Sequence, residues 1–150
     1  MGARRKARAC ALQILYAVDV GGLSAEEART AFWLSCRADP RVREFAEAIV
    51  AGTLGEQDRI DAVIRTHAVN WEVERMAALD RNILRAATWE LSATPETPSS
   101  VIINEAIELA KQYSTDDSGK FVNGVLDHIR AAVRPDPESH DRPSTDPTAV

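Results

Sequence analysis

The stretch that decides the fold is residues 99–130, which read SSVIINEAIELAKQYSTDDSGKFVNGVLDHIR. Its first half repeats apolar residues with the i, i+3, i+4, i+7 spacing of one helix face, at Ile103, Ala106, Ile107 and Ala110. Its second half starts a new helical pattern, at Val122, Val125, Leu126, Ile129 and, just beyond the stretch, Val133. The acidic segment STDDSG separates the two patterns. We therefore predict two helices that meet at an acidic turn.

The second of these helices has an unusual flank beside its apolar face. Lys120, Phe121, Gly124 and His128 follow one another along it at about 100° per residue. A glycine inside a helix costs about 1 kcal/mol relative to alanine, so Gly124 predicts a close approach to the backbone. Phe121 has two interpretations on the residues alone, an exposed ring that stacks on an unpaired base or an aromatic at the edge of the core.

Helical periodicity continues through the rest of the chain. Ser24 with Glu27 fits a capping box, Asp39-Pro40 fits an N-cap followed by a first-turn proline, and Ser99 or Ser100 is expected to cap the next helix. A chain of 150 residues with 45% hydrophobic residues can form one domain without metals or disulfides. We predict an all-α protein of about seven helices whose two halves join near residues 52–58.

Charge is distributed unevenly along the chain. The 18 basic and 23 acidic side chains give a net charge of −5, yet four cations precede the first acid, and these are Arg4, Arg5, Lys6 and Arg8. A basic patch on an acidic body predicts a localised anionic partner. Residues 135–150 contain four prolines and almost nothing to bury, so we predict a disordered acidic tail.

No part of the sequence resembles a signal peptide or a membrane span. The two cysteines, Cys10 and Cys36, lack the spacing of a zinc or redox motif and are expected to be free thiols. Together these features predict a cytoplasmic protein in a reducing compartment. We predict no metal and no cofactor, and no contact with a membrane.

Catalytic motifs are also missing, so the sequence favours a binding protein over an enzyme. Glu90 falls within an apolar arc, and a buried carboxylate needs a salt bridge or backbone donors. We expect such a partner rather than a catalytic role. His67 is interpreted as a hydrogen-bonded histidine at the core edge, and Trp71, in a break between helices, as an anchor of the core.

Several blocks in a consistent order resemble the NusB family of bacterial transcription antitermination factors. They are ARRKARACALQILY (3–16), LDRNILR (79–85), Glu90-Leu91, INEAIELAK (103–111) and DSGKFVNGVL (117–126). The resemblance covers the chain from about Ala3 to Arg134. It implies an all-α fold of two three-helix subdomains, at about 1–55 and 56–134. It also implies binding of boxA RNA in ribosomal RNA leader transcripts, as a heterodimer with NusE within the transcription elongation complex.

The resemblance further implies which residues bind. RNA contacts would fall on the basic N-terminal motif and on the turn before the last helix, at Arg4, Arg5, Lys6, Arg8, Asp117, Ser118, Lys120 and Phe121. NusE contacts would fall on Tyr16, Asp80, Arg81 and Glu90. Asp117 also fits a helix N-cap, and Tyr16 also fits half-buried packing. Self-association is left open. The competing interpretation is a protein-docking helical module without direct RNA contact.

Overall fold

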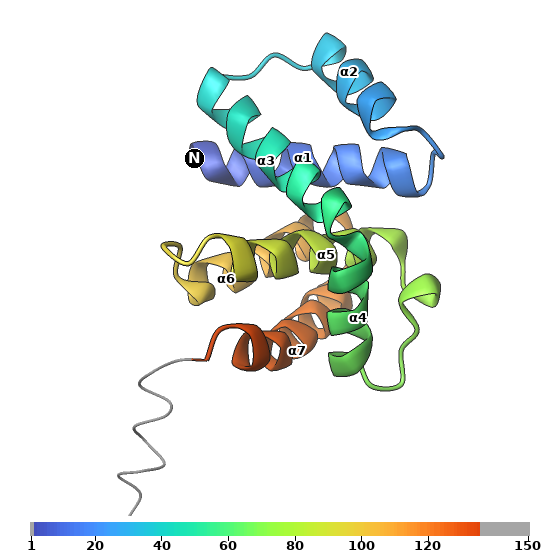
Figure 1. Ribbon diagram of the computed structural model, residues 1–150, viewed down its shortest axis with the longest axis vertical. Coiled ribbons are helices and arrows are strands. Elements are labelled where there is room, and N and C mark those ends of the chain that lie inside the picture. The colour runs from blue at the N-terminus through green and yellow to red at the C-terminus, as the bar shows by residue number, and fades with distance from the viewer. Residues whose placement is uncertain (1, 136–150) are drawn as a thin grey trace, which may run out of the picture.

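The structure, a computed structural model, describes residues 2–135, so the predicted acidic tail lies outside the described residues apart from Pro135. It contains helices throughout this range and no strand within it, as the sequence predicts. Figure 1 shows their arrangement. The elements are α1 (Ala3–Asp19), α2 (Ala25–Ser35), α3 (Pro40–Gly55), α4 (Gln57–His67), the 3₁₀ turn η1 (Val73–Arg75), α5 (Ala78–Ala93), α6 (Ser99–Tyr113) and α7 (Asp116–Val133).

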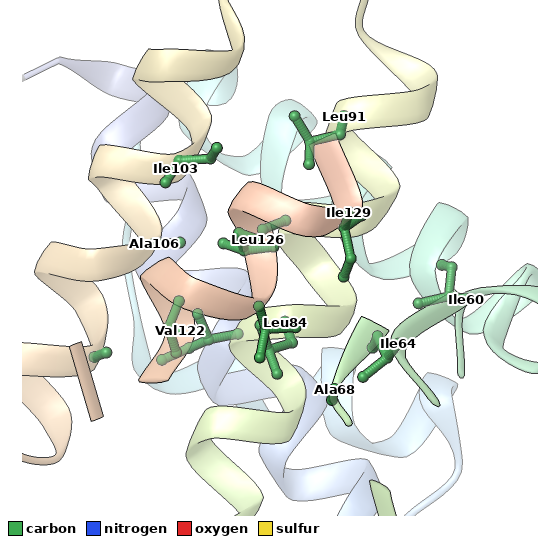
Figure 2. Close-up of a cluster of buried hydrophobic side chains, with 14 of the residues drawn as sticks. Ile60, Ile64, Ala68, Leu84, Leu91, Ile103, Ala106, Val122, Leu126 and Ile129 are labelled. Atoms are coloured by element: carbon green, nitrogen blue, oxygen red, sulfur yellow. The ribbon is translucent and has the colours of Figure 1, made fainter. Parts of the chain in front are cut away.

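The buried apolar residues form two clusters. Helices α1, α2 and α3 surround one of them, in the upper half of Figure 1. Helices α4 to α7 surround the other, so the seven described helices divide three and four rather than three and three. Figure 2 shows Leu84, Leu126 and Ile129 meeting in the second cluster. Leu12 of α1 joins that cluster, which places α1 across the boundary between the two groups.

Local sequence explains the starts of α2 and α3. Ser24 accepts from the Glu27 backbone N–H while the Glu27 carboxylate accepts from the Ser24 backbone N–H, which confirms the capping box. Asp39 caps α3 ahead of Pro40, also as predicted. The expected serine cap of α6 is wrong, because the helix begins at Ser99 itself and its N-cap is Pro98.

A close approach between helices occurs at Gly52 rather than at Gly124. A Cβ at Gly52 of α3 would collide with the indole ring of Trp89 on α5, so only glycine fits there. A Cβ at Gly124 would meet nothing within 4 Å, and this position is exposed. The predicted close approach at Gly124 is therefore not found within residues 2–135.

Buried ion pairs fix α1 and α4 on α5. Arg85 donates two hydrogen bonds to Asp61 of α4, at 2.8 and 2.9 Å, and lies 3.4 Å from Asp19 at the end of α1. Asn82 donates to the same Asp19 carboxylate at 2.9 Å. Because charged partners in the interior need one another, these contacts set how α1 and α4 lie against α5.

Candidate nucleic-acid interface

The basic N-terminal residues occupy the first turns of α1. Arg4, Arg5 and Lys6 are exposed. The Arg4 guanidinium donates to Thr97 Oγ1 at 3.0 Å and lies 4.7 Å from the centre of the Phe45 ring. These contacts hold Arg4 in place while its side chain stays at the surface. Three neighbouring cations with this exposure form a site that phosphate groups can reach.

Arg5 connects this basic turn to α6. Its Nε and Nη2 donate to the two carboxylate oxygens of Glu105 at 2.8 and 2.6 Å. The hydrogen bond from Arg5 lowers the pKa of Glu105. The Arg5 side chain is nevertheless 47% exposed, so part of its guanidinium faces solvent. The pair therefore orients the cation along α6 without enclosing it.

Arg8 differs from its three basic neighbours because it points inward. It is 8% exposed, and its Nε and Nη2 donate to Glu90 of α5 at 2.7 and 2.8 Å. Glu90 is 2% exposed, so its expected salt bridge is confirmed. The predicted phosphate contact of Arg8 has no geometric basis in this structure, because the guanidinium is enclosed and already engaged. The same enclosure keeps Glu90 away from a protein partner.

The N-cap of α7 lies two residues earlier than expected. Thr115 is the N-cap, and its hydroxyl accepts from the Ser118 backbone N–H at 3.0 Å. Asp117 lies in the first turn of α7 with its side chain exposed, so its predicted capping role is wrong. Ser118 is 8% exposed, and its hydroxyl donates to Asp80 Oδ2 at 3.2 Å.

An aromatic pair lies beside this turn. The ring of Phe121, which is half-buried, and the ring of Trp71 have their centres 5.1 Å apart at an angle of 59°. Trp71 is 55% exposed, so the prediction that it anchors the core is wrong. Lys120 is exposed next to Phe121. The turn thus presents a cation and two aromatic rings. The sequence did not predict that Trp71 belongs to this site, because the break between helices that contains it has no periodic pattern.

The residues predicted to contact NusE differ in how exposed their side chains are. Tyr16 is 39% exposed near the end of α1, where Val20 and Leu23 are also exposed at 53% and 38%. These three exposed apolar side chains, close together in sequence, are candidates for contact with a protein partner. Glu90 and Asp80 are buried, at 2% and 8% exposed.

Arg81 holds the segment before α5 in place. Its side chain is 12% exposed and pairs with Asp19 at 2.7 Å. Its Nη1 donates to the backbone carbonyls of Val73 and Met76 at 3.2 and 3.1 Å. Arg81 therefore fixes η1, and with it the approach of Trp71 to α7. His67 is half-buried with Nδ1 2.9 Å from the Val63 carbonyl, in line with its expected structural role.

Helix α6 connects the two candidate RNA-contacting regions. Arg5 of α1 pairs with Glu105, while Gly119 of α7 lies against Ile107 and Lys111. Positions 105 and 111 are separated by about 9 Å along a helix axis, at 1.5 Å per residue. Arg5 and Gly119, more than 100 residues apart in sequence, therefore contact the same helix.

The chain matches a known protein family over most of its length. A model of the NusB family matches residues 5–131. This chain belongs to the NusB family. Among NusB relatives, the transcription antitermination protein NusB of Sorangium cellulosum is 48% identical over 129 residues, which are 86% of this chain and 92% of the relative. The corresponding protein of Koribacter versatilis is 43% identical, covering 85% of this chain and 88% of the relative.

Solved NusB structures share the fold. T. maritima NusB superposes with a TM-score of 0.80 at 33% identity, over 88% of this chain and 93% of that one. A structure of the antitermination factors NusB and NusE in complex with double-stranded RNA gives 0.78 at 27% identity, over 87% and 97% of the two chains. The resemblance seen in the sequence blocks and the all-α prediction are both confirmed.

Two further properties concern residues 2–135 of this NusB family member. Within that range, no three histidine, cysteine, aspartate or glutamate side chains are grouped as metal ligands would be. None of the helices in the same range has both the length and the apolar character needed to cross a lipid bilayer.

Proposed function

We propose that this protein is a transcription antitermination factor that binds boxA RNA of ribosomal RNA leader transcripts together with NusE. The observation that carries the proposal is the position of its exposed cations. Arg5, in the exposed basic turn at the start of α1, pairs with Glu105 of α6, and Gly119, next to the exposed Lys120, lies against Ile107 and Lys111 of the same helix. Positions 105 and 107 lie about 200° apart around the α6 axis, so an RNA strand would pass across α6 to meet both groups. The relatives of this family member are antitermination proteins.

The RNA contacts divide into two kinds. The four exposed cations bind phosphates, which positions the strand without reading its sequence. Phe121 and Trp71 provide aromatic surface on which an unpaired base stacks, for about 1–3 kcal/mol per base. Asp117, exposed on the first turn of α7, accepts a hydrogen bond from a base or a ribose hydroxyl.

Three of the predicted contact residues act by positioning others. Arg8 and Glu90 hold α1 on α5 and thereby aim the exposed cations. Arg81 fixes the segment that carries Trp71. Removing any of them would change RNA or NusE binding through the fold, although none needs to touch a ligand.

NusE binds the apolar surface formed by Tyr16, Val20 and Leu23. This surface lies at the opposite end of α1 from the arginines, about 16 Å away at 1.5 Å per residue, so RNA and NusE can bind at the same time. The complex then joins the transcription elongation complex in the cytoplasm. The protein contributes binding surfaces to it and catalyses no reaction. We also propose that residues 1–55 and 56–134 act as two subdomains.

The test measures binding of a fluorescently labelled boxA RNA by anisotropy, with purified NusE present. Arg5→Ala with Lys6→Ala should weaken RNA binding at least ten-fold and leave NusE pull-down unchanged. Arg65→Ala, an exposed cation on α4, is the matched control and should bind RNA normally. Tyr16→Ala should reduce NusE pull-down.

The competing function, a protein-docking module, predicts NusE binding without RNA binding. It is favoured by the exposed apolar surface at Tyr16, which needs only a protein partner. If the wild-type protein captures NusE but shows no boxA binding with NusE present, the docking module is correct and the RNA role is not.

A further inference from the structure

The acidic tail begins at a fixed place on the fold. Arg134, at the end of α7, donates from Nε and Nη2 to the Leu91 carbonyl at 3.0 and 2.8 Å, and from Nη2 to the Thr94 carbonyl at 2.9 Å. These acceptors lie in the last turn of α5 and at its C-cap. Pro135 follows directly and is exposed. The tail therefore starts beside the loop between α5 and α6.

The same loop holds the start of α1. Thr97 of this loop accepts from Arg4 through its hydroxyl at 3.0 Å, and from Arg134 through its carbonyl oxygen. Figure 1 shows the start of α1, this loop and the end of α7 on one side of the molecule. The place where the tail begins is thus separated from the Arg4 guanidinium by a single residue.

A groove lies next to Arg4, between the start of α1 and α3. Arg4 and Arg41 line it together with Phe45, whose ring centre lies 4.7 Å from the Arg4 guanidinium carbon. The Arg41 side chain is 81% exposed and 3.7 Å from Asp39. Glu44 also lines the groove, and the two guanidinium groups outweigh its single negative charge.

The end of α1 adds to the positive potential of this groove. Gly2, the N-cap, has no side chain with which to cap the helix, and the first turn contains no acidic residue. Gly2 and Ala3 line the groove beside the two guanidinium groups. A helix N-terminus carries roughly half a positive charge and offers backbone N–H groups to anions. A carboxylate in the groove would therefore meet both a helix end and two cations.

The chain itself carries carboxylates that can reach the groove. Asp136, Glu138 and Asp141 follow Pro135 in the sequence. At up to about 3.5 Å per residue, a chain that starts at Arg134 can place position 138 about 14 Å away and position 141 about 24 Å away. Because only Thr97 lies between the Arg134 and Arg4 guanidinium groups, this span is enough to enter the groove.

We propose that the acidic segment 136–141 of the tail docks in this groove and competes with RNA for Arg4. Its carboxylates pair with Arg4 and Arg41 across the groove. The competition rests on the proposed RNA binding, whereas the docking does not depend on it. RNA carries a phosphate at every nucleotide and displaces the segment, so the tail lowers the affinity for RNA without preventing binding. An RNA that engages few cations is affected most.

Attachment to the same chain favours this segment over an acidic segment of another molecule. A short tether gives its carboxylates an effective concentration of about millimolar. The tail of a second copy is present only at the concentration of the protein, which is far lower in a micromolar solution. Each exposed ion pair is weak by itself, so the tether decides which carboxylates occupy the groove.

Carbodiimide crosslinking of the full chain tests the docking without RNA. The reagent joins a carboxylate to an amine that touches it, and mass spectrometry maps the resulting amide. Arg41→Lys adds an amine to the groove and keeps the charge. The lysines already present are Lys6, Lys111 and Lys120. An equal mixture of ¹⁵N-labelled and unlabelled protein separates crosslinks within one molecule from crosslinks between two.

The expected crosslinks join Glu138 or Asp141 to position 41 or to Lys6 within one molecule, and they are lost at high salt. Lys111 and Lys120, at the turn between α6 and α7, should remain unlinked to the tail. The docking is overturned if the tail forms no crosslink at position 41 or Lys6, or if it links all lysines equally. It is also overturned if these crosslinks form only between molecules, which would assign the groove to a second copy.

Affinity for a labelled boxA RNA, measured by anisotropy with NusE present, tests the competition. Glu138→Gln with Asp141→Asn should bind RNA at least about three-fold more tightly than the wild type at low salt, as the loss of two exposed ion pairs allows. Glu26→Gln with Asp58→Asn makes the same change in net charge at exposed positions of α2 and α4, and it should leave the affinity unchanged.

The outcomes separate this inference from the proposed function. An equal gain in both variants, or no gain in either, overturns the competition. If RNA binds in a salt-sensitive manner but the crosslinks are absent, the inference fails and the proposed function stands. If the crosslinks form but boxA RNA does not bind, the docking stands and the proposed function fails.

Discussion

Arg8 of α1 and Glu90 of α5 form a buried salt bridge with two parallel hydrogen bonds, at 2.7 and 2.8 Å. The pair lies 82 residues apart in sequence and joins the helix group that carries the exposed cations to the group that carries the α7 turn. The geometry of the proposed RNA surface therefore depends on a contact that is enclosed in the interior.

The first prediction concerns the stability that this pair provides. Arg8→Ala leaves the Glu90 carboxylate buried without a partner, so the free energy of unfolding should fall by about 3–5 kcal/mol. Urea denaturation followed by circular dichroism measures this change. Arg8→Met with Glu90→Leu should recover most of the loss, since a buried apolar pair of similar volume replaces the ions. An Arg8→Ala protein of unchanged stability that binds RNA poorly would instead make Arg8 a direct RNA contact.

The sequence predicted that Glu90 needs a partner but could not identify Arg8. Periodicity reports which face of a helix is buried, and it carries no information on which distant residue fills that face. Arg8 was therefore grouped with Arg4, Arg5 and Lys6, although it lies one turn further along α1. The helices and the capping box at Ser24 depend on neighbouring residues and were predicted correctly.

Trp71, at the candidate site, is a second residue whose position could not be predicted from the sequence. A large aromatic in a short break is most often buried, and composition offers no contrary signal. Arg81 holds the backbone at Val73, just after Trp71, and in this position the Trp71 ring packs against Phe121 at the surface. Only the tertiary arrangement joins these two rings and Asp80 in one pocket.

The second prediction contrasts two helical glycines. Gly52→Ala places a methyl group within the Trp89 ring, and repacking should cost about 1–3 kcal/mol of unfolding free energy. Gly124→Ala is the matched control, because its methyl group meets open space and should stabilise α7 by about 0.5–1 kcal/mol. Thermal unfolding of both variants tests the contrast. Equal effects would mean that α3 does not pass against Trp89.

The third prediction is a pH dependence caused by Asp80. Burial raises its pKa in the folded protein above the ordinary value of 3.8, so the folded state holds this proton more tightly than the unfolded state. The contribution to stability is present below the unfolded pKa and is lost as pH rises through the folded pKa. Asp80→Asn does not titrate, so its stability relative to the wild type should increase between pH 3 and pH 7.

Urea unfolding of the wild type and Asp80→Asn across that range checks the sign. A relative stability of Asp80→Asn that stays constant or decreases toward pH 7 would mean that the carboxylate finds a donor in the folded protein.

The salt dependence of boxA RNA binding, with NusE present, tests the central claim most directly. Four exposed cations, Arg4, Arg5, Lys6 and Lys120, should give a slope of about −3 in a plot of log affinity against log salt, at roughly −0.7 per contact with single-stranded RNA. Replacing Arg5 and Lys6 by alanine should bring the slope to about −1.4, since two contacts remain. An unchanged slope in this variant would contradict the account, because the RNA would then be held by other groups.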